Sequence, residues 1–362
     1  MSFHDDCLVF DGHTDVPTRL WEEPADLSQR LSDRHIDLPR LREGGVDGLV
    51  FALYIPAALD PPRGLEHARR LHQATLDGLC PGLRQATTAA EVERAVRRGE
   101  VAVVLGLENG RPLTVPGALD EIAAWGARYV TLTHMGTHEW CDASTDAAAH
   151  GGLSGAGEEI VHQMNRRGIL ADVSHVSDDA VLHTLEVSRA PVLASHSSAR
   201  ALCDHPRNLP DPLVREIGRR GGLVMANSFP VFVGPAAAEA DRERQPVIRP
   251  LLEGTLDDYY ANPGETARRQ ARILAEHPIP PVPLSLFVDH LMHLVELAGE
   301  EHVGIGTDFD GIPETLEGFE DVSRFPALTA ALLERGVDRA GVRRILGESF
   351  VRLLAEAARL AG

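Results

Sequence analysis

Residues 101–109 read VAVVLGLEN, a continuous apolar run that ends in one carboxylate and one amide. An unbroken apolar run of this length is typical of a strand that is buried on both faces of a parallel sheet. A strand with one solvent-exposed face instead alternates apolar and polar residues. Thr88 and Glu91 form a helix-capping pattern upstream, and Gly99 is placed to end that helix before the run begins. The sequence therefore predicts a helix that leads into a buried parallel strand, with Glu108 at its carboxyl end.

Seven further apolar runs of similar length recur along the chain, and helical patterns separate them. The eight predicted strands are Cys7–Phe10, Leu49–Ile55, Val101–Leu107, Arg128–Thr133, Ile169–Val173, Val192–Ser195, Leu223–Asn227 and Val303–Thr307. A strand and a helix repeated eight times predict a (β/α)8 barrel, in which the carboxyl ends of all strands meet at one mouth. We expect one domain over residues 1–362, because no repeat or low-complexity linker divides the chain.

One segment departs from this alternation. Residues 230–283 carry many prolines, a charged run at 241–244 and the pair Tyr259 and Tyr260. We interpret the segment as an elaborated loop after the seventh strand, with one helix near Glu265–Glu276. Loops after barrel strands form the rim of the active site in this architecture, but a surface excursion without a role fits the pattern equally well.

The composition is that of an acidic globular protein. The 362 residues carry a formal net charge of −19, which argues against nucleic acid or an anionic membrane as a partner. All 35 basic residues are arginine. The four cysteines form no C-x-x-C pair, and no apolar run reaches the roughly 18–20 residues that span a bilayer. The polar N-terminus favours the cytoplasm, and a homodimer is compatible with the sequence.

Metal-binding residue types follow six of the eight predicted strands. They are His13 and Asp15 after the first strand, Glu108 after the third, His134 after the fourth, His175 after the fifth, His196 after the sixth and Asp308 after the eighth. A single buried histidine is more often a packed core residue than a ligand. Unrelated core histidines have no reason to follow the same end of successive strands, so the whole set predicts a site at the barrel mouth.

The spacing of these residues indicates how two ions could be held. Residues i and i+2 of a strand face the same side, so His13 and Asp15 can bind one ion, and His175 with His196 can bind a second. Glu108 lies between these groups around the barrel and can bridge both ions. Nitrogen and carboxylate ligands without thiolate suit two Zn²⁺ ions, with Mn²⁺, Fe²⁺ or Co²⁺ as substitutes. Because the chain has no lysine, a carboxylated lysine cannot be the bridge.

Six stretches of the chain occur in the order of a known set of motifs. They are Asp11–Asp15, Thr131–His134, Asp172–Ser177, Ser195–Ser198, Arg207–Asp211 and Gly304–Gly311. They resemble the renal (membrane) dipeptidase family of the amidohydrolase superfamily, and the resemblance runs from Val9 to about Leu354. It implies a binuclear zinc dipeptidase that often accepts a D-residue at the C-terminal position of its substrate. Asn109 departs from the pattern, because secreted animal members typically carry glycine there.

The resemblance implies the same two pairs of metal ligands and the same bridging glutamate, and it adds three residues that handle the substrate. His134 resembles the histidine that contacts the substrate carbonyl. Arg207 resembles the arginine that binds the C-terminal carboxylate of the substrate, although its loop alone would suggest a surface residue. Asp308 resembles the catalytic acid and base.

These parts together predict a reaction. A water shared by two ions loses its proton near neutral pH, and the metal-bridging hydroxide attacks the peptide carbonyl. Asp308 would take the proton and pass it to the departing amine, while His134 would stabilise the oxyanion. A lactonase, deaminase or cyclic amidase of the same superfamily shares the ligand set, and a non-enzymatic metal-binding barrel is a further alternative. Arg207 and an intact Asp308 favour the dipeptidase.

Overall fold

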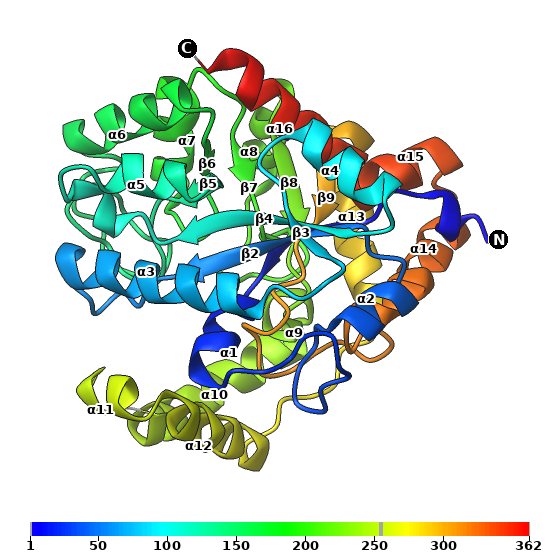
Figure 1. Cartoon of the computed structure of the whole chain (residues 1–362), viewed down its shortest axis with the longest axis horizontal. Coiled ribbons are helices and arrows are strands. Elements are labelled where there is room, and N and C mark those ends of the chain that lie inside the picture. Colours follow the sequence, from blue (N-terminus) through cyan, green and yellow to red (C-terminus); the bar gives the residue numbers. More distant parts are fainter. Residues whose placement is uncertain (1, 253–255, 362) are drawn as a thin grey trace.

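The computed structural model describes residues 2–252 and 256–361, and its centre is a nearly closed barrel of parallel strands (Figure 1). A bridge between Thr14 and Phe309 brings the end of the last strand back to the first. A further strand, β3 (Leu83–Gln85), pairs with β4 outside the circle. In order around the barrel the strands are β1 (Phe10–Thr14), β2 (Gly48–Tyr54), β4 (Val101–Glu108), β5 (Ala127–Thr131), β6 (Leu170–Asp172), β7 (Leu193–Ala194), β8 (Leu223–Ala226) and β9 (Val303–Ile305). The predicted (β/α)8 barrel is confirmed.

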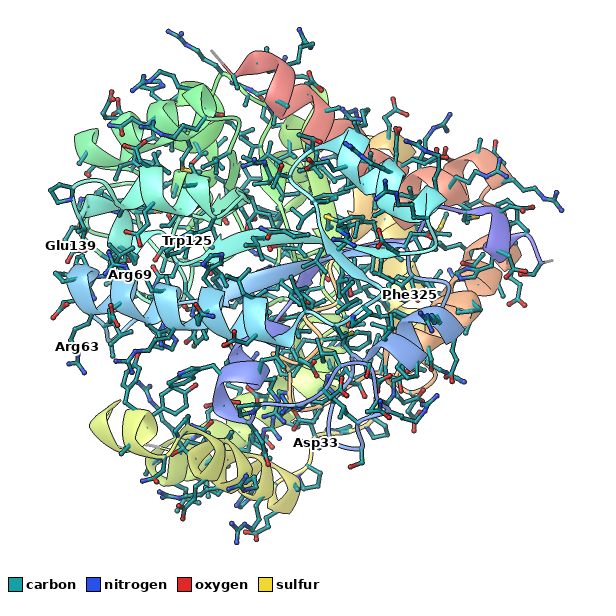
Figure 2. All side chains as sticks on the ribbon, viewed as in Figure 1. Asp33, Arg63, Arg69, Trp125, Glu139 and Phe325 are labelled. Atoms are coloured by element: carbon teal, nitrogen blue, oxygen red, sulfur yellow. The ribbon has the colours of Figure 1, made fainter. Side chains whose placement is uncertain are left out.

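Helices follow the strands and cover the outside of the barrel (Figure 1). None of the helices within residues 2–252 and 256–361 has the length and apolar character needed to cross a bilayer. The helices that alternate with the strands are α1 (Val16–Glu22), α2 (Leu38–Glu43), α3 (Pro61–Gly78), α4 (Ala89–Arg97), α5 (Ala118–Ala124), α6 (Gly155–Arg166), α7 (Asp178–Val187), α8 (Asp211–Arg219), α13 (Leu284–Ala298), α14 (Phe325–Glu334), α15 (Arg339–Arg343) and α16 (Ser349–Leu360). Charged side chains such as Arg63 and Glu139 lie at the periphery, whereas Phe325 is buried among the helices (Figure 2).

The interior of the barrel is shaped by one glycine on β4. A Cβ atom on Gly106 would lie 2.4 Å from the ring of Tyr129 on β5, so a side chain at position 106 would displace that ring. With glycine there, the ring fits inside the barrel, and its hydroxyl lies 2.7 Å from Nδ1 of His13 on β1. The packing under the mouth therefore sets the position of one predicted metal ligand.

The first predicted strand was placed too early. The run Cys7–Phe10 was expected to be the strand, but β1 begins at Phe10 and continues through His13 to Thr14. The apolar run ends at Phe10, and the residues after it are polar. They form a buried strand because the carboxylate of Asp11 accepts hydrogen bonds from the backbone N–H and the hydroxyl of Thr307, at 2.9 and 2.5 Å. The strand pairs directly with β2 along this polar stretch.

Asp15 is likewise not a strand residue. It occupies the N-cap position of α1, so the expected strand alternation of His13 and Asp15 does not apply. The carboxylate nevertheless turns back toward the barrel, and its Oδ2 lies 3.8 Å from Nε2 of His13. The two side chains meet because the chain bends at the helix start.

The segment after the seventh barrel strand is largely helical, which corrects the expectation of a loop with one helix. It contains α9 (Pro230–Val233), α10 (Pro235–Leu252), α11 (Leu256–Ala261) and α12 (Pro263–Glu276). Pro246 and Pro250 lie inside α10. Proline disfavours the interior of a helix, but the preceding run of Ala, Glu and Arg has a high helix propensity that offsets this cost. We call α10, α11 and α12 the cap helices, and they lie together at the bottom of Figure 1. Nη1 of Arg244 donates a hydrogen bond of 2.6 Å to Oε1 of Glu314, and this contact joins α10 to the loop after β9.

Candidate metal centre and active site

Four imidazoles surround the carboxylate of Glu108 at the carboxyl end of β4. The Nε2 atoms of His175, His196, His13 and His134 lie 3.1, 3.4, 3.5 and 3.7 Å from a carboxylate oxygen of Glu108. The histidines come from β1 and from the segments that follow β5, β6 and β7, and Glu108 itself is only 3% exposed. The strand-end residues picked out from the sequence therefore do meet at one mouth.

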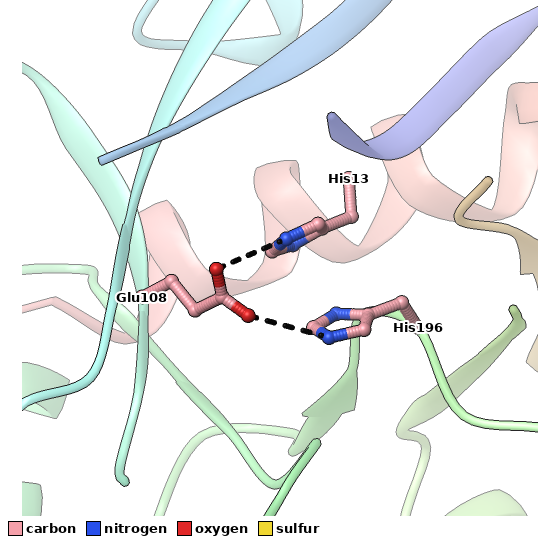
Figure 3. A group of neighbouring side chains, drawn as sticks. All are labelled: His13, Glu108 and His196. Atoms are coloured by element: carbon pink, nitrogen blue, oxygen red, sulfur yellow. Dashed lines mark ion pairs between the residues drawn. The ribbon is translucent and has the colours of Figure 1, made fainter. Parts of the chain in front are cut away.

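The two oxygens of Glu108 face different partners. Oε2 is the atom near His13, which also has the carboxylates of Asp15 and Asp308 close by. Oε1 is the atom near His175 and His196. Figure 3 shows His13 and His196 approaching opposite oxygens of the same carboxylate. Glu108 thus lies between His13 on one side and His175 and His196 on the other, although the ligand atoms of His13 and His196 also lie within 4.8 Å of each other.

Hydrogen bonds orient two of the imidazoles. The hydroxyl of Tyr129 lies 2.7 Å from Nδ1 of His13, and the hydroxyl of Ser195 lies 2.7 Å from Nδ1 of His196. Each bond occupies Nδ1 and leaves Nε2 directed at Glu108. Partners of this kind fix the ring and the tautomer of a histidine that binds metal.

The donor atoms fit divalent metal ions. Nε2 of His13 is buried and has no hydrogen-bond partner among the residues that the structure describes. The Nε2 atoms of His175 and His196 lie 2.8 Å apart, so their lone pairs face each other unless a proton or a cation lies with them. Buried nitrogen and carboxylate groups that converge without partners are the ligand set of a Zn²⁺-type ion. Three such groups are His13 with Glu108 and His196, Glu108 with His134 and His175, and His13 with Asp15 and Asp308.

Burial and mutual charge set the pKa values in this cluster. Burial disfavours the charged form of His13, but attraction to Glu108 outweighs it and raises the pKa of His13 to about 10. Burial lowers the pKa of His134 to about 4 and holds the pKa of His175 and of His196 well below the ordinary histidine value. Burial opposes ionisation of Glu108, yet His13 and the other histidines keep its pKa well below the usual range. The ionised carboxylate and the three neutral imidazoles are in the protonation state that metal ligands need, and His13 would release its proton when an ion binds there.

Asp308 lies beside Asp15, in the loop that follows β9. A Cβ atom on Gly311 would lie 2.1 Å from Oδ2 of Asp15 and 3.0 Å from Oδ1 of Asp308, so both carboxylates use the space beside this glycine. The other oxygen of Asp308 accepts a hydrogen bond from Nδ2 of Asn227 at 2.9 Å. Burial raises the pKa of the Asp308 carboxyl, which favours a group that can hold a proton.

The backbone is strained at this mouth. Asn109, His175, Asp308 and Asp310 are the non-glycine residues with positive φ in the described ranges, at 85°, 70°, 67° and 66°. Each is a predicted site residue or lies within two positions of one. Such conformations cost about 1–3 kcal/mol each and cluster at functional sites, where the surrounding structure holds them.

Arg207 is buried beside the same cluster. Its Nη2 donates a hydrogen bond to the carbonyl of His196 at 3.3 Å, and its guanidinium carbon lies 5.4 Å from the ring centre of Phe232. Its Nε has no partner within the described part of the chain, although the residue is only 5% exposed. Burial lowers the pKa of Arg207 to about 10, so the guanidinium is still charged at neutral pH. Part of a planar, charged fork is thus free for an anion.

A cavity of about 1230 Å³ opens above the cluster. Its floor includes Asp15, Glu108, His134, Arg207 and Asp308, which are all predicted site residues. Its outer wall comes from the cap helices, so the segment after the seventh barrel strand is part of the cavity. Cap residues on this wall include Gln245, Leu252, Tyr259, Gln270 and Leu274.

The profile of the family described as "Membrane dipeptidase (Peptidase family M19)" matches residues 2–362. The chain belongs to peptidase family M19. This membership makes it a metal-dependent hydrolase of the dipeptidase type and bears out the resemblance of its motifs. Dipeptidase verJ of Clonostachys rogersoniana is 31% identical over 370 residues, which cover 96% of this chain and 84% of that protein.

Solved structures of related proteins share the architecture. The probable dipeptidase PvdM from Pseudomonas aeruginosa is 28% identical, with a TM-score of 0.84 over 99% of this chain and 97% of that one. A metallopeptidase from Rhodobacter sphaeroides, solved with a phosphinate mimic of the dipeptide L-Ala-D-Ala, is 25% identical. Its TM-score is 0.78, over 97% of this chain and 99% of that one.

The M19 site also contains residues that the strand-end pattern did not reveal. Tyr129 and Ser195 orient histidines, Asn227 bonds Asp308, and the ring of Tyr54 lies 4.8 Å from that of His134 on the cavity wall. Ser195 directly precedes a predicted ligand, so its neighbourhood was visible in the sequence. The partners of the others come from remote strands, and no local pattern identifies them.

Removing the hydroxyl of Tyr129 tests whether it orients a metal ligand. We expect Tyr129→Phe to weaken zinc binding about 10- to 100-fold, because His13 loses the partner that fixes its ring. Competition with a chromogenic chelator measures the affinity. Tyr259→Phe is the matched control, since it removes a hydroxyl of cap helix α11 that bonds Glu22 of α1 at 2.9 Å and touches no predicted ligand. Equal zinc affinity in both variants and the parent would contradict the role of Tyr129.

Proposed function

We propose that this M19 chain holds two divalent ions, most suitably Zn²⁺, and hydrolyses the peptide bond of dipeptides, including those with a D-residue at the C-terminal position. The observation that carries the proposal is the division of the Glu108 carboxylate, with Oε2 toward His13 and Oε1 toward His175 and His196. A single ion would need only one of these groups. Two groups that share one carboxylate suit a pair of bridged ions.

The ligands that we assign are His13 and Asp15 for one ion, His175 and His196 for the other, and Glu108 for both. Divalent ions held there would supply an acidified water and a Lewis acid for the peptide carbonyl. No serine or cysteine nucleophile is then required. The remaining chemistry falls to side chains of the chain that bind the dipeptide and move protons.

Arg207 is suited to bind the C-terminal carboxylate of the substrate. It is charged, buried at the cavity floor and only partly hydrogen-bonded within the described residues. A planar guanidinium matches a carboxylate through paired N–H donors. Binding at this fixed point would bring the peptide bond over Glu108, because both residues line the same floor. The Rhodobacter relative carries a dipeptide mimic with a D-residue at the second position, which supports the same stereochemical tolerance here.

Asp308 and His134 are suited to proton transfer and carbonyl polarisation. Oδ1 of Asp308 is directed to the side of Asp15, where it can take a proton and hand it to the departing amine. His134 is neutral at working pH because burial lowers its pKa to about 4. A neutral imidazole that lines the cavity can donate one N–H to the oxygen on which negative charge develops.

The dipeptide carboxylate gives the sharpest test of the substrate class. We expect kcat/KM for a dipeptide to exceed that for its C-terminal amide, and Arg207→Met to lower the value for the free acid about 10- to 100-fold while leaving the amide little changed. Arg200→Met is the matched control, because Arg200 pairs with Asp178 instead, at 2.6 Å. Equal rates on acid and amide would contradict the carboxylate-binding role of Arg207. Turnover of a lactone, an aminated ring or a cyclic amide without turnover of either dipeptide form would favour a lactonase, deaminase or cyclic amidase. Two bound ions without turnover of any of these substrates would favour a non-enzymatic metal-binding barrel.

Replacing the proposed acid and base should slow the chemical step. We expect Asp308→Asn to lower kcat about 10²–10⁴-fold with little change in KM, because asparagine accepts a hydrogen bond but cannot carry the proton. Metal content and melting temperature, measured on the same preparation, separate this role from metal binding and from folding. Asp310→Asn is the control in the same loop, and its Oδ1 can still accept the hydrogen bond from the backbone N–H of His35. A stable, metal-loaded Asp308→Asn enzyme with the parent kcat would contradict the mechanism.

A further inference from the structure

Asn227 lies just after β8 and is fully buried beneath the cavity floor. Its side chain makes polar contacts in two directions. Oδ1 accepts a hydrogen bond from the backbone N–H of Phe229 at 2.7 Å. Nδ2 lies 2.9 Å from Oδ2 of Asp308 and 3.5 Å from the carbonyl oxygen of His196. One amide therefore touches both the proposed proton carrier and the backbone of a proposed metal ligand.

The orientation of this amide is determined by its partners. Phe229 contributes a backbone N–H, which only the oxygen of the amide can accept. Asp308 and His196 contribute oxygens, which only the nitrogen can bond. A flipped amide would break every one of these contacts and would place an oxygen against a carboxylate. Asn227 is therefore a fixed donor toward Asp308.

That donor leaves one oxygen of Asp308 for chemistry. The backbone N–H of Asp308 is held by the carbonyl of His13 at 3.0 Å, so the residue is fixed at its main chain as well. Asn227 then engages Oδ2, and Oδ1 is the oxygen that lies beside Gly311 and Asp15. Without Asn227, the carboxylate could rotate about its last bond and exchange the two oxygens.

Asn227 also shares a partner with the proposed carboxylate anchor. The carbonyl of His196 accepts from Nη2 of Arg207 at 3.3 Å and lies 3.5 Å from Nδ2 of Asn227. Arg207, which would hold the end of the substrate, and Asn227, which bonds the proposed proton carrier Asp308, thus both contact the carbonyl of His196. A fixed distance between anchor and proton carrier is what correct positioning over one peptide bond requires.

We propose that Asn227 is a positioning residue for Asp308, which directs one carboxylate oxygen to the reacting bond and holds it at a set distance from Arg207. The inference rests on the proposed role of Asp308. Asn227 is not among the residues that line the cavity, and its side chain is not one of the proposed metal ligands. If its effect on the rate passes through Asp308, a double-mutant cycle detects the dependence. An effect through His196 or Arg207 would instead change the metal content or KM.

The test compares kcat for the dipeptide in the parent, Asn227→Ala, Asp308→Asn and the double variant. We expect Asn227→Ala to lower kcat about 10- to 100-fold on its own but to have almost no further effect when Asp308 is already asparagine. The affinity of a phosphinate dipeptide mimic, the metal content and KM should change little in Asn227→Ala. Asn227→Asp keeps the shape and the bond to Phe229 but loses the donor, so it should also lower kcat if the alanine variant folds poorly.

Asn165→Ala is the matched control for the loss of a buried amide. Its Oδ1 likewise accepts a backbone N–H, that of Arg189 at 2.7 Å, far from the cavity floor. It should lower the melting temperature without lowering kcat. Additive losses in the double variant, or a parent-like kcat in both stable Asn227 variants, would overturn the positioning role. A parent-like kcat in Asp308→Asn would instead overturn the proposed role of Asp308 itself.

Discussion

The carboxylate of Glu108 and the four imidazoles around it form the constraint on which the rest of the structure depends. Their nitrogens lie 3.1–3.7 Å from its oxygens, and the group is almost closed to solvent. Burying a carboxylate costs several kcal/mol unless charge compensates it, and only one of the imidazoles, His13, carries a raised pKa. The remaining nitrogens present lone pairs. Divalent cations bound between these groups would compensate the buried charge and the facing lone pairs, so the same residues that shape the mouth would hold the metal.

Hydrogen bonds between neighbouring strands hold the mouth of the barrel together. Asp11 on β1 accepts from Thr307 beyond β9, and Asp172 on β6 accepts from the backbone N–H of Ser195 beyond β7 at 2.8 Å. These bonds fix the strand ends from which the ligands project. They also support the positive φ angles of His175 and Asp308, which would be unfavourable in an isolated chain. Rigid strand ends hold the ligands in place before any ion arrives.

The sequence was sufficient for the architecture and for the residues at the floor, because both follow from strand periodicity and from what comes after each strand. Its failures have one cause. The first strand was expected to end before Asp11 because the partner of this carboxylate, Thr307, is almost 300 positions away. The prolines of the cap helices suggested a loop, because contacts that stabilise these helices, such as that of Arg244 with Glu314, join residues far apart in the sequence. Asn227 was read as the end of a strand for the same reason. Side-chain pairing across the barrel decides these positions, and local pattern does not encode it.

Metal content of the Glu108→Gln enzyme, determined together with that of the parent, tests the central claim most directly. The substitution keeps the shape of the side chain and removes the negative charge between the two groups of histidines. The account predicts two ions per parent chain and no more than one in Glu108→Gln, with kcat reduced by several orders of magnitude. Glu139→Gln, at a surface pair with Arg111, should keep both ions. A fully active parent with one ion, or a Glu108→Gln enzyme with two ions and the parent kcat, would contradict the account.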